Sequence, residues 1–497
     1  MRAFNLRLRC RRLCPSTGTA EPRMTPVSAS WLALLQGRRA AYTWLLLLAV
    51  GVCAMGTHLL ATVLPSVVAD IGGIAFYAWA SMLYSMAAII GTACGGLVMA
   101  WLGPRRTYMG GGSVVLGGAV GCAVAPHIAV LLIACTLQGL GSGLLVAVAY
   151  SMVSELYAAD LRSRVLSAIS GVWSVAALLG PIIGGMFAGI GWWRGAFWSV
   201  VSLLTLLVSF AWYTLPSLER PRTAPSLPVV RLALLGAGVL SVASSGQVVA
   251  LGMRLMLVGG ACVLVGLTFH LDTRSPNRLF PSQPLALTTR VGTAAWMIVL
   301  FGMTAIQVTV FMPLTVQTLY GVSPLGAGYF TAVFSLSWTT MALCSAGLRD
   351  RWVHAAILLG PLAVLCGVWG LGVSVGFGDV LRLGMFLALT GAGIGVCSAH
   401  IGSWTIAAAR PGEGALTAAA LPTLQSLGFA FGAAIAGLVA NTAGLARGMS
   451  RATVASAATW LYGLSIVGPV LILVCTLRFL WLHRDVFVVE PRSQGCL

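Results

Sequence analysis

The sequence predicts an all-α membrane protein whose helices cross a lipid bilayer many times. Hydrophobic residues make up 59% of the 497 residues and charged residues only 8%, whereas about a quarter of a soluble domain is charged. The mean hydropathy is +0.95, and the 60 glycines suit membrane helices, which contain more glycine than soluble ones. A chain of this length with so little polar surface cannot cover its exterior in water, so we expect the bilayer to be its solvent.

Fourteen apolar runs are long enough to span a membrane, since crossing the hydrocarbon core takes about 20 residues of α-helix. None of the eleven acidic residues lies in the middle of a run, as expected where a charge in hydrocarbon is costly. We therefore predict fourteen transmembrane helices. The runs are 42–64, 74–100, 107–125, 128–150, 164–189, 195–215, 229–250, 253–271, 291–316, 325–347, 353–374, 383–409, 415–445 and 455–481.

The arginines predict which side of the membrane each connection faces, because basic loops are retained in the cytoplasm. All 29 basic residues are arginine, and with a cytoplasmic N-terminus 24 of them fall in inner segments and 5 in outer ones. A miscounted span would exchange the sides of everything downstream and blur this asymmetry. We therefore expect a multi-pass protein of the plasma membrane, the inner membrane in bacteria, with both termini in the cytoplasm.

Several classes of protein are excluded by what the chain contains. The net charge of +18 comes from short arginine clusters between apolar runs, which indicates topology rather than binding to nucleic acid. The twelve cysteines show neither metal-ligand spacing nor a secreted disulfide framework. No Ser/His/Asp arrangement and no phosphate-binding glycine loop ending in lysine is present. We expect no enzyme activity, no metal, no cofactor and no ATP-driven pump.

A segment rich in glycine and arginine lies between the second and third runs. It begins at Gly96 and reads Gly-Leu-Val-Met-Ala-Trp-Leu-Gly-Pro-Arg-Arg. Gly96 and Gly103 permit two helices to approach closely around a tight turn, and Arg105 and Arg106 place cations at helix ends and at the inner leaflet. We assign these four residues a conformational role.

Two further glycine motifs lie inside runs. Gln138 is followed by Gly-Leu-Gly in the fourth run, and the fifth run contains Gly-Pro-Ile-Ile-Gly-Gly. Proline kinks a helix and frees a backbone carbonyl, while glycines permit close packing on a neighbouring helix. A Trp-Arg pair follows at the entry to the sixth run, where tryptophan suits the membrane interface. The conformational candidates here are Gly139, Gly141, Gly180, Pro181, Gly184, Gly185 and Arg194.

In this order and at these distances, the motifs resemble those of the major facilitator superfamily, specifically its fourteen-span branch of drug:proton antiporters. The family patterns are G-x-L-a-D-r-x-G-r-r in the inner loop, R-x-x-Q-G-x-G in the fourth span and G-P-x-x-G-G in the fifth. Residues 55–65 of the first run are similar to the family's first span, and residues 347–351 resemble a worn copy of the first inner loop. The resemblance covers nearly all of residues 42–482.

The resemblance implies two six-helix bundles of the major facilitator type, which rock about a central cavity, with two inserted helices between them. Proline-rich stretches at 216–228 and 272–290 mark the boundaries. The basic tail is expected to be disordered, with Met24 as an alternative start and binding to anionic lipid as a second interpretation. The expected domains are the tail 1–41, a bundle 42–215, linkers and inserted helices 216–290, a bundle 291–482 and a cytoplasmic tail 483–497.

The chain departs from the family at three positions that carry charge there. Ala100 stands where the family usually has Asp, Cys135 where it has a buried Arg associated with proton coupling, and Gly56 where the first span has Asp. These departures remove the family's usual groups for proton coupling. The sequence therefore leaves both proton-coupled and uncoupled transport open.

The pathway for substrate or protons is expected to use the few polar and aromatic side chains inside the runs. A free imidazole titrates near neutrality and can carry a proton, so His58 and His400 could replace the missing carboxylates. A neutral histidine bonded to a backbone carbonyl is the alternative, which we favour for His400, whereas both interpretations stand for His58. For Gln138 we favour an interhelical hydrogen bond, and for most aromatics packing or contact with lipid. The candidates are His58, Tyr84, Gln138, Trp173, Gln307, Gln317, Trp338, His400 and Gln425.

We expect a secondary active transporter that exports small amphipathic or drug-like molecules by alternating access, with protons as the exchanged ion. The alternative is an uncoupled facilitator or an uptake permease for a small organic solute. A non-transporting membrane sensor is a remote third hypothesis, disfavoured because no soluble output domain is attached. The expected partners are the lipid bilayer, a small-molecule substrate and protons, without nucleic acid, and we expect a monomer.

Overall fold

The computed structural model is entirely helical over the part of the chain that it describes, which comprises residues 36–157, 159–215, 228–275, 278–282, 284, 286–345, 348, 351–411 and 413–487. Two short 3-10 turns, η2 (Ile74–Phe76) and η3 (Leu445–Arg447), lie in connections. The other regular elements are sixteen α-helices. They are α1 (Gly37–Ile71), α2 (Tyr77–Leu102), α3 (Pro104–Ala123), α4 (Ile128–Leu156), α5 (Ala159–Gly189), α6 (Trp193–Thr214), α7 (Val229–Ser245), α8 (Leu251–Arg274), α9 (Arg290–Val310), α10 (Met312–Tyr320), α11 (Pro324–Ser345), α12 (Arg351–Phe377), α13 (Val380–Ala407), α14 (Gly414–Thr442), α15 (Arg451–Leu464) and α16 (Val467–Phe487).

Each predicted apolar run coincides with a helix, and two runs contain a break. α9 passes into α10 at Phe311, just before Pro313, because proline has no N–H to continue the helical hydrogen bonds. α15 passes into α16 at Ser465. Some predicted regions, namely the basic tail up to residue 35, most of the linker 216–228, residues 346–347 and 349–350, and the tail from residue 488, lie outside the described residues.

Eleven of the helical segments are long and apolar enough to cross a membrane, counting α9–α10 and α15–α16 as one segment each. The three others are α3, α7 and α11. α7 has 17 residues, α3 contains six glycines, and α11 contains three serines and three threonines. Short length or small polar residues thus lower the mean hydropathy or the length that marks a membrane span.

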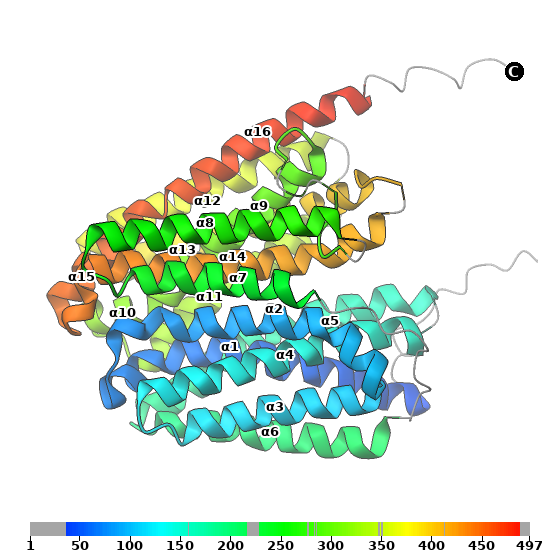
Figure 1. The fold of residues 1–497 in the computed structure, drawn as a ribbon. Coiled ribbons are helices and arrows are strands. Elements are labelled where there is room, and N and C mark those ends of the chain that lie inside the picture. Colours follow the sequence, from blue (N-terminus) through cyan, green and yellow to red (C-terminus); the bar gives the residue numbers. More distant parts are fainter. Residues whose placement is uncertain are drawn as a thin grey trace, which may run out of the picture.

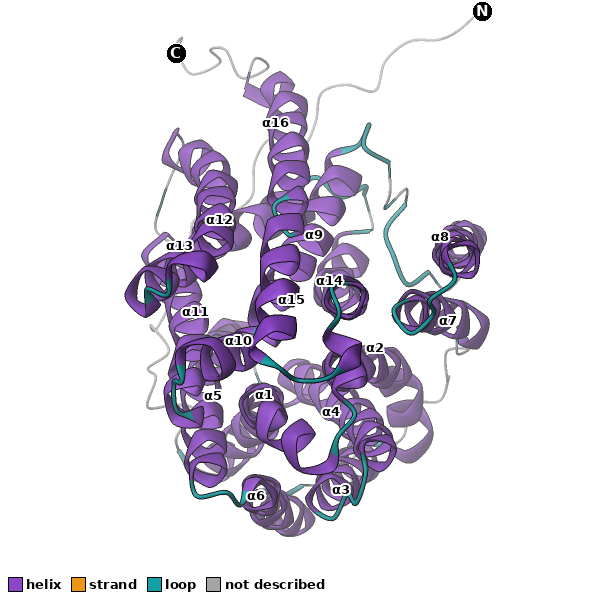
Figure 2. Ribbon diagram, turned by 90° about the vertical axis from the view of Figure 1, so that its left-hand side faces the viewer, coloured by secondary structure: helices purple, strands orange, loops and turns teal. Residues whose placement is uncertain are grey.

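The helices form two lobes with a pair of helices at their side. Figure 2 looks along the helices and shows α1–α6 as one cluster, the N-terminal lobe, and α9–α16 as a second, the C-terminal lobe. The pair α7 and α8, which we call the insert, lies beside α2 and α14. Only 11% of the apolar window of α8 is buried inside the protein, against 72% for α9–α10. The insert is therefore peripheral.

Two pairs of helices join the lobes, α5 with α11 on one side and α2 with α14 on the other. Between them, α1 contacts α10 and α11. α1 begins and α16 ends at the same end of the bundle, at the right in Figure 1. We call this the terminal side and the other end the opposite side.

Candidate functional site

The Gly-Pro segment of α5 lies where α5 crosses two other helices. A Cβ added at Gly180 would lie 2.8 Å from the Cβ of His58 in α1, and Gly184 packs on the same helix one turn further along. A Cβ at Gly185 would overlap the backbone of Leu325 in α11. Because no larger residue fits at Gly180 or Gly185, the motif brings α1 and α11 against opposite faces of α5.

The contact between α5 and α11 is reciprocal. Gly328 of α11 packs on Pro181 of α5, where an added Cβ would lie 2.7 Å from the Pro181 Cβ and 3.1 Å from the Thr62 side chain of α1. Pro181, which lies inside the continuous helix α5, is thus in direct contact with the other lobe. At this crossing α1 and α5 of the N-terminal lobe both contact α11 of the C-terminal lobe.

His58 lies at this crossing. Its side chain is partly exposed, and none of the residues that the structure describes donates a hydrogen bond to the ring or accepts one from it. The His58 backbone carbonyl accepts a hydrogen bond of 3.0 Å from the Thr62 hydroxyl. An imidazole with both nitrogens available can take up and release a proton.

His400 has a different environment. It is 8% exposed, and its Nε2 lies 3.0 Å from the carbonyl oxygen of Ser345, which ends α11. This bond connects α13 to α11 within the C-terminal lobe. Because a carbonyl oxygen can only accept, Nε2 donates in this bond, which gives the buried ring a hydrogen-bond partner.

Tyr84 and Gln138 are buried inside the N-terminal lobe. The Tyr84 hydroxyl lies 2.9 Å from the Ser142 hydroxyl of α4 and 3.2 Å from the Cys53 carbonyl of α1, so it joins three helices. Gln138, 4% exposed, packs on Gly118 of α3. No described residue hydrogen-bonds its amide, so the interhelical bond that we favoured from the sequence is not made by these residues.

A ladder of glycines holds α4 against its neighbours. A Cβ at Gly139 would overlap the Tyr84 carbonyl of α2, one at Gly143 the Ala88 carbonyl of α2, and one at Gly141 would lie 2.6 Å from the Val115 nitrogen of α3. The glycines therefore alternate between two neighbouring helices.

The C-terminal lobe contains the same ladder, which the sequence analysis missed. Gly391 and Gly395 of α13 meet the carbonyls of Phe334 and Trp338 in α11, and Gly393 meets α12. The sequence contains a pattern that could have indicated it, because Gly-x-Gly-x-Gly occurs at residues 139–143 of α4 and at residues 391–395 of α13. α13 is therefore the counterpart of α4.

Two predicted glutamines lie in the C-terminal lobe. Gln307, 8% exposed, accepts a hydrogen bond of 3.2 Å from the Ser465 hydroxyl at the break between α15 and α16. Gln425 lies in α14, where its backbone carbonyl packs on Gly302 of α9. Neither glutamine reaches the crossing of α1, α5 and α11.

The remaining pathway candidates are aromatic, apart from Gln317. Trp338 of α11 is partly buried and packs edge-on against Phe334, with ring centroids 5.9 Å apart. Trp173 of α5 is 44% exposed. The Gln317 Nε2 in α10 is buried and has no hydrogen-bond partner among the described residues. The structure thus brings only His58 to the motif of α5.

The segment between α2 and α3 is a tight turn at Gly103, whose φ of +78° is accessible to glycine at little cost. Arg105 donates a hydrogen bond of 2.6 Å to the Trp212 carbonyl at the end of α6, where a cation meets the negative end of the helix. Arg106 is exposed. The side-chain positions of Gly96 and Ala100 lie outside the described part of the chain.

Arg194 forms an ion pair with Asp70 on the opposite side, at 2.7 Å. The Trp193 indole N–H donates to the same carboxylate at 3.1 Å, and Arg194 also donates to the Ala125 carbonyl at 3.1 Å. The pair joins α1, α6 and the α3–α4 turn. The sequence indicated Arg194 as a conformational residue, but its pairing with Asp70 requires the fold.

The described carboxylates all lie at helix ends. Asp70 and Asp272 lie at the ends of α1 and α8, and Asp379 and Glu413 precede α13 and α14. The side chains of Glu155 and Asp160 lie outside the described residues. Within the described residues, no group of three His, Cys, Asp or Glu residues could hold a metal ion.

Comparison with known proteins gives a consistent result. The profile of the Major Facilitator Superfamily matches residues 46–433. A probable multidrug-efflux transporter of Mycobacterium tuberculosis is 31% identical over 442 residues, which cover 84% of this chain and 90% of the relative. Multidrug resistance protein 3 of Bacillus subtilis is 26% identical over 299 residues, covering 57% and 56% of the two chains.

A solved structure of a peptide transporter superimposes with a TM-score of 0.64 and covers 89% of this chain and 95% of its own. Its sequence identity of 17% means that it shares the fold, and carries no inference about substrate.

Proposed function

The chain belongs to the major facilitator superfamily of secondary transporters, and from this premise we propose that it exports small amphipathic or drug-like molecules by alternating access, in exchange for protons. The observation that carries the proposal is the 31% identity, over 84% of the chain, to a probable multidrug-efflux transporter. A pathway lined mostly by apolar and aromatic side chains suits such substrates.

Alternating access is supported by the way in which the lobes meet. They join along α5–α11 and α2–α14, and the glycines of α5 permit a close, smooth crossing. We propose that the lobes rock about these seams so that a site near the midplane faces one side and then the other. In this proposal all fourteen helical segments span the membrane, and both chain ends face the cytoplasm.

His58 is our candidate for the proton-carrying group. It is partly exposed at the crossing of α1 with α5, and no described carboxylate lies in the middle of a helix. Protonation of His58 would place a charge beside the contact between the lobes, which is costly unless the surroundings become hydrated. A proton at this position would therefore favour a conformation in which water reaches it.

An efflux assay tests the function. The purified protein is reconstituted into proteoliposomes that are loaded with a fluorescent amphipathic cation. An imposed proton gradient is expected to accelerate transport of this cation. A protonophore should abolish the acceleration. Labelling the two chain ends in intact cells tests the topology, since ends on different faces would contradict an even number of spans.

An uncoupled facilitator is the second candidate, favoured by Cys135 at the position of the family's coupling arginine. Cys135 is fully buried, and its Sγ lies 3.9 Å from that of Cys122, so the position is filled by packed thiols. Flux that persists at an equal rate after the gradient is dissipated would establish this alternative and exclude antiport.

A further inference from the structure

The insert is fixed at the terminal side by the linker that follows α8. Asp272, 2% exposed at the end of α8, forms an ion pair with Arg231 of α7. The same carboxylate accepts the N–H groups of Leu279 and Phe280 at 2.9 and 3.0 Å. Phe280 is fully buried and packs on Phe269 of α8. Because every oxygen of the buried carboxylate has partners, this arrangement holds the linker against the insert.

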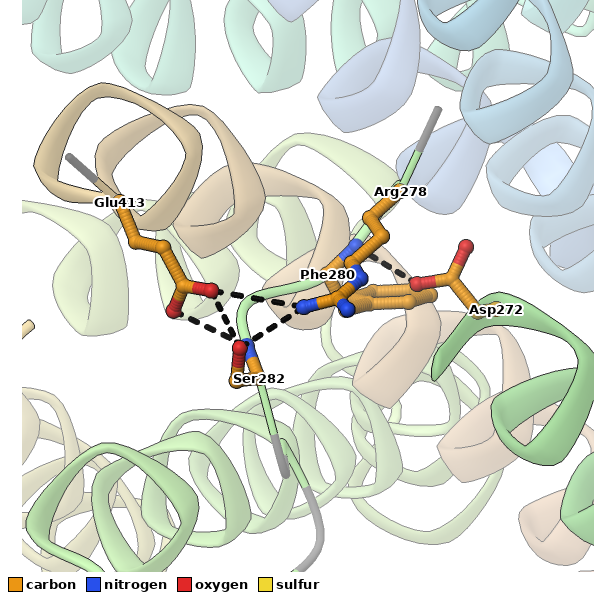
Figure 3. Close-up of polar contacts among 5 residues, drawn as sticks. All are labelled: Asp272, Arg278, Phe280, Ser282 and Glu413. Carbon is orange, nitrogen blue, oxygen red and sulfur yellow. Dashed lines mark hydrogen bonds and ion pairs between the residues drawn. The ribbon is translucent and has the colours of Figure 1, made fainter. Parts of the chain in front are cut away.

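The other end of the linker is fixed to the C-terminal lobe. Ser282 donates both its hydroxyl and its N–H to Glu413, immediately before α14, and Arg278 lies 3.4 Å from the same carboxylate. In Figure 3, Asp272 and Glu413 approach the linker from opposite sides. We call Asp272, Arg278, Ser282 and Glu413 the clamp. It connects α8 to α14.

The insert also packs on α14 along its length. Val239, Val242 and Ala243 of α7 form one buried cluster with alanines of α14, and a Cβ at Gly246 would lie 2.9 Å from the Leu438 Cα. Toward α2 the fit is looser, with a crevice between α7 and α2. It is lined by Met86, Ile89, Ile90, Leu232, Leu235, Gly236, Val239 and Leu427.

On the opposite side, one carbonyl of the N-terminal lobe is held by two amides. The Ala75 carbonyl in η2 accepts a hydrogen bond of 2.8 Å from the Gln247 side chain, in the turn of the insert. It accepts a second, also 2.8 Å, from Asn441 near the end of α14. A carbonyl oxygen has two lone pairs, so both are used, one by the insert and one by the C-terminal lobe.

Tyr77, two residues after Ala75, destabilises the state in which this contact is made. Its ring stacks on Phe311 of the C-terminal lobe, with centroids 5.0 Å apart. The side chain is 1% exposed, and none of the described residues hydrogen-bonds its hydroxyl. A buried hydroxyl without a partner destabilises the state that buries it. Separation of the lobes here would expose it to water.

We propose that the insert is an arm of the C-terminal lobe that latches the N-terminal lobe shut on the opposite side. The clamp and the packing on α14 make the insert move with the C-terminal lobe. Gln247 and Asn441 donate hydrogen bonds to the Ala75 carbonyl when the opposite side is closed. Tyr77 limits the stability of the closed state, so that the latch can open. The inference rests on the alternating access proposed above.

The experiment measures distances in the full-length protein in nanodiscs, by electron paramagnetic resonance, without substrate. Spin labels are introduced through noncanonical amino acids, so that the native cysteines remain. The positions are Ile190 of the N-terminal lobe, Val249 of the insert and Met449 of the C-terminal lobe, which are 72%, 94% and 41% exposed on the opposite side. The three pairs of labels report changes in distance between the N-terminal lobe, the insert and the C-terminal lobe.

Loss of one amide, in Gln247→Ala or Asn441→Ala, is expected to raise the ratio of open to closed populations about fivefold, the worth of one net hydrogen bond. The double variant should exceed the product of the two, because it leaves the Ala75 carbonyl without a partner. Tyr77→Phe should act in the other direction and lower the ratio about fivefold. Ser456→Ala removes a hydroxyl–carbonyl bond inside the C-terminal lobe and should leave the ratio unchanged.

When the ratio rises, the distances from Ile190 to Val249 and to Met449 should lengthen together while Val249–Met449 stays fixed. Lengthening of Ile190–Met449 and Val249–Met449 with Ile190–Val249 fixed would overturn the proposal, because the insert would then follow the N-terminal lobe. If a second distance exists but the variants do not shift its population, the latch is wrong and alternating access stands. If no second distance exists under any condition, both proposals fail.

Discussion

The two lobes share one packing scheme and differ in the chemistry placed on it. α4 and α13 carry the same glycine ladder against corresponding neighbours. In the N-terminal lobe, however, the ladder is accompanied by the Tyr84 hydroxyl with Ser142, whereas the corresponding positions of the C-terminal lobe hold Phe334 and Ile394. The two lobes therefore share the close backbone contacts, which few residues can satisfy, and differ in the polar groups placed beside them.

The largest expected effect tests the shared part of this comparison. Gly139→Ala and Gly391→Ala each place a Cβ onto a backbone carbonyl and should destabilise the folded protein by about 3 kcal/mol. Thermal unfolding in detergent measures this. Gly117→Ala and Gly376→Ala are matched controls with open space around the new Cβ, and they should stabilise by about 0.5–1 kcal/mol. A large loss in one lobe only would show that the ladders are not equivalent.

The two histidines provide the next test. His58→Gln should reduce gradient-driven efflux to the rate measured with the gradient dissipated, because glutamine cannot carry a proton at neutral pH. His400→Gln should keep gradient-driven efflux, since its partner is a backbone carbonyl that an amide can also reach. An unchanged pH dependence in both variants would remove histidine from the mechanism.

Exchange of the aromatic residues between the ladders should have a smaller effect. Tyr84→Phe removes the hydrogen bonds to Ser142 and the Cys53 carbonyl and should cost about 1 kcal/mol. Phe334→Tyr adds a hydroxyl to a buried ring and should cost about 1–3 kcal/mol if the hydroxyl stays buried without a partner. The measurement is the same unfolding experiment, and a stabilised Phe334→Tyr would mean that the C-terminal lobe retains a polar partner at this position.

The smallest expected effect is the pH dependence of the clamp. The Ser282 hydroxyl, followed by the Ser282 N–H and Arg278, lowers the pKa of Glu413 below its usual value. A lowered pKa means that the stabilisation is fully present above the ordinary pKa of a glutamate and is lost as the pH falls through the lower value. The distribution of distances between labels at Val249 and Met449 should therefore stay narrow at neutral and mildly acidic pH. It should broaden only at lower pH. Glu413→Gln should show the broad distribution at every pH.

The sequence predicted the helices well because each one needs only a local apolar run. It did not predict the break at Phe311, although Pro313 was visible, because proline is tolerated in membrane helices whose neighbours satisfy the freed groups. Fourteen runs were predicted, but α3, α7 and α11 fall short of the length or hydropathy of a span.

The candidate site was predictable only in part. The α5 motif could be recognised by its pattern. Its close contacts with α1 and α11 are possible because the glycines of the motif have no side chains. Two contacts join residues more than 100 positions apart, namely the ion pair of Asp70 with Arg194 and the hydrogen bond from Gln247 to the Ala75 carbonyl. Such contacts depend on which helices become neighbours, and no local pattern specifies that.

The crossing of α5 with α11 has a consequence for how this protein can evolve. Gly185 meets the backbone of Leu325, and a peptide unit is the same whichever amino acids surround it. In the proposed mechanism, mutations of side chains along the substrate pathway can therefore alter which compounds are transported, while this contact between α5 and α11 keeps its form. In the proposed mechanism, the choice of transported compound and the movement of the lobes therefore depend on different residues.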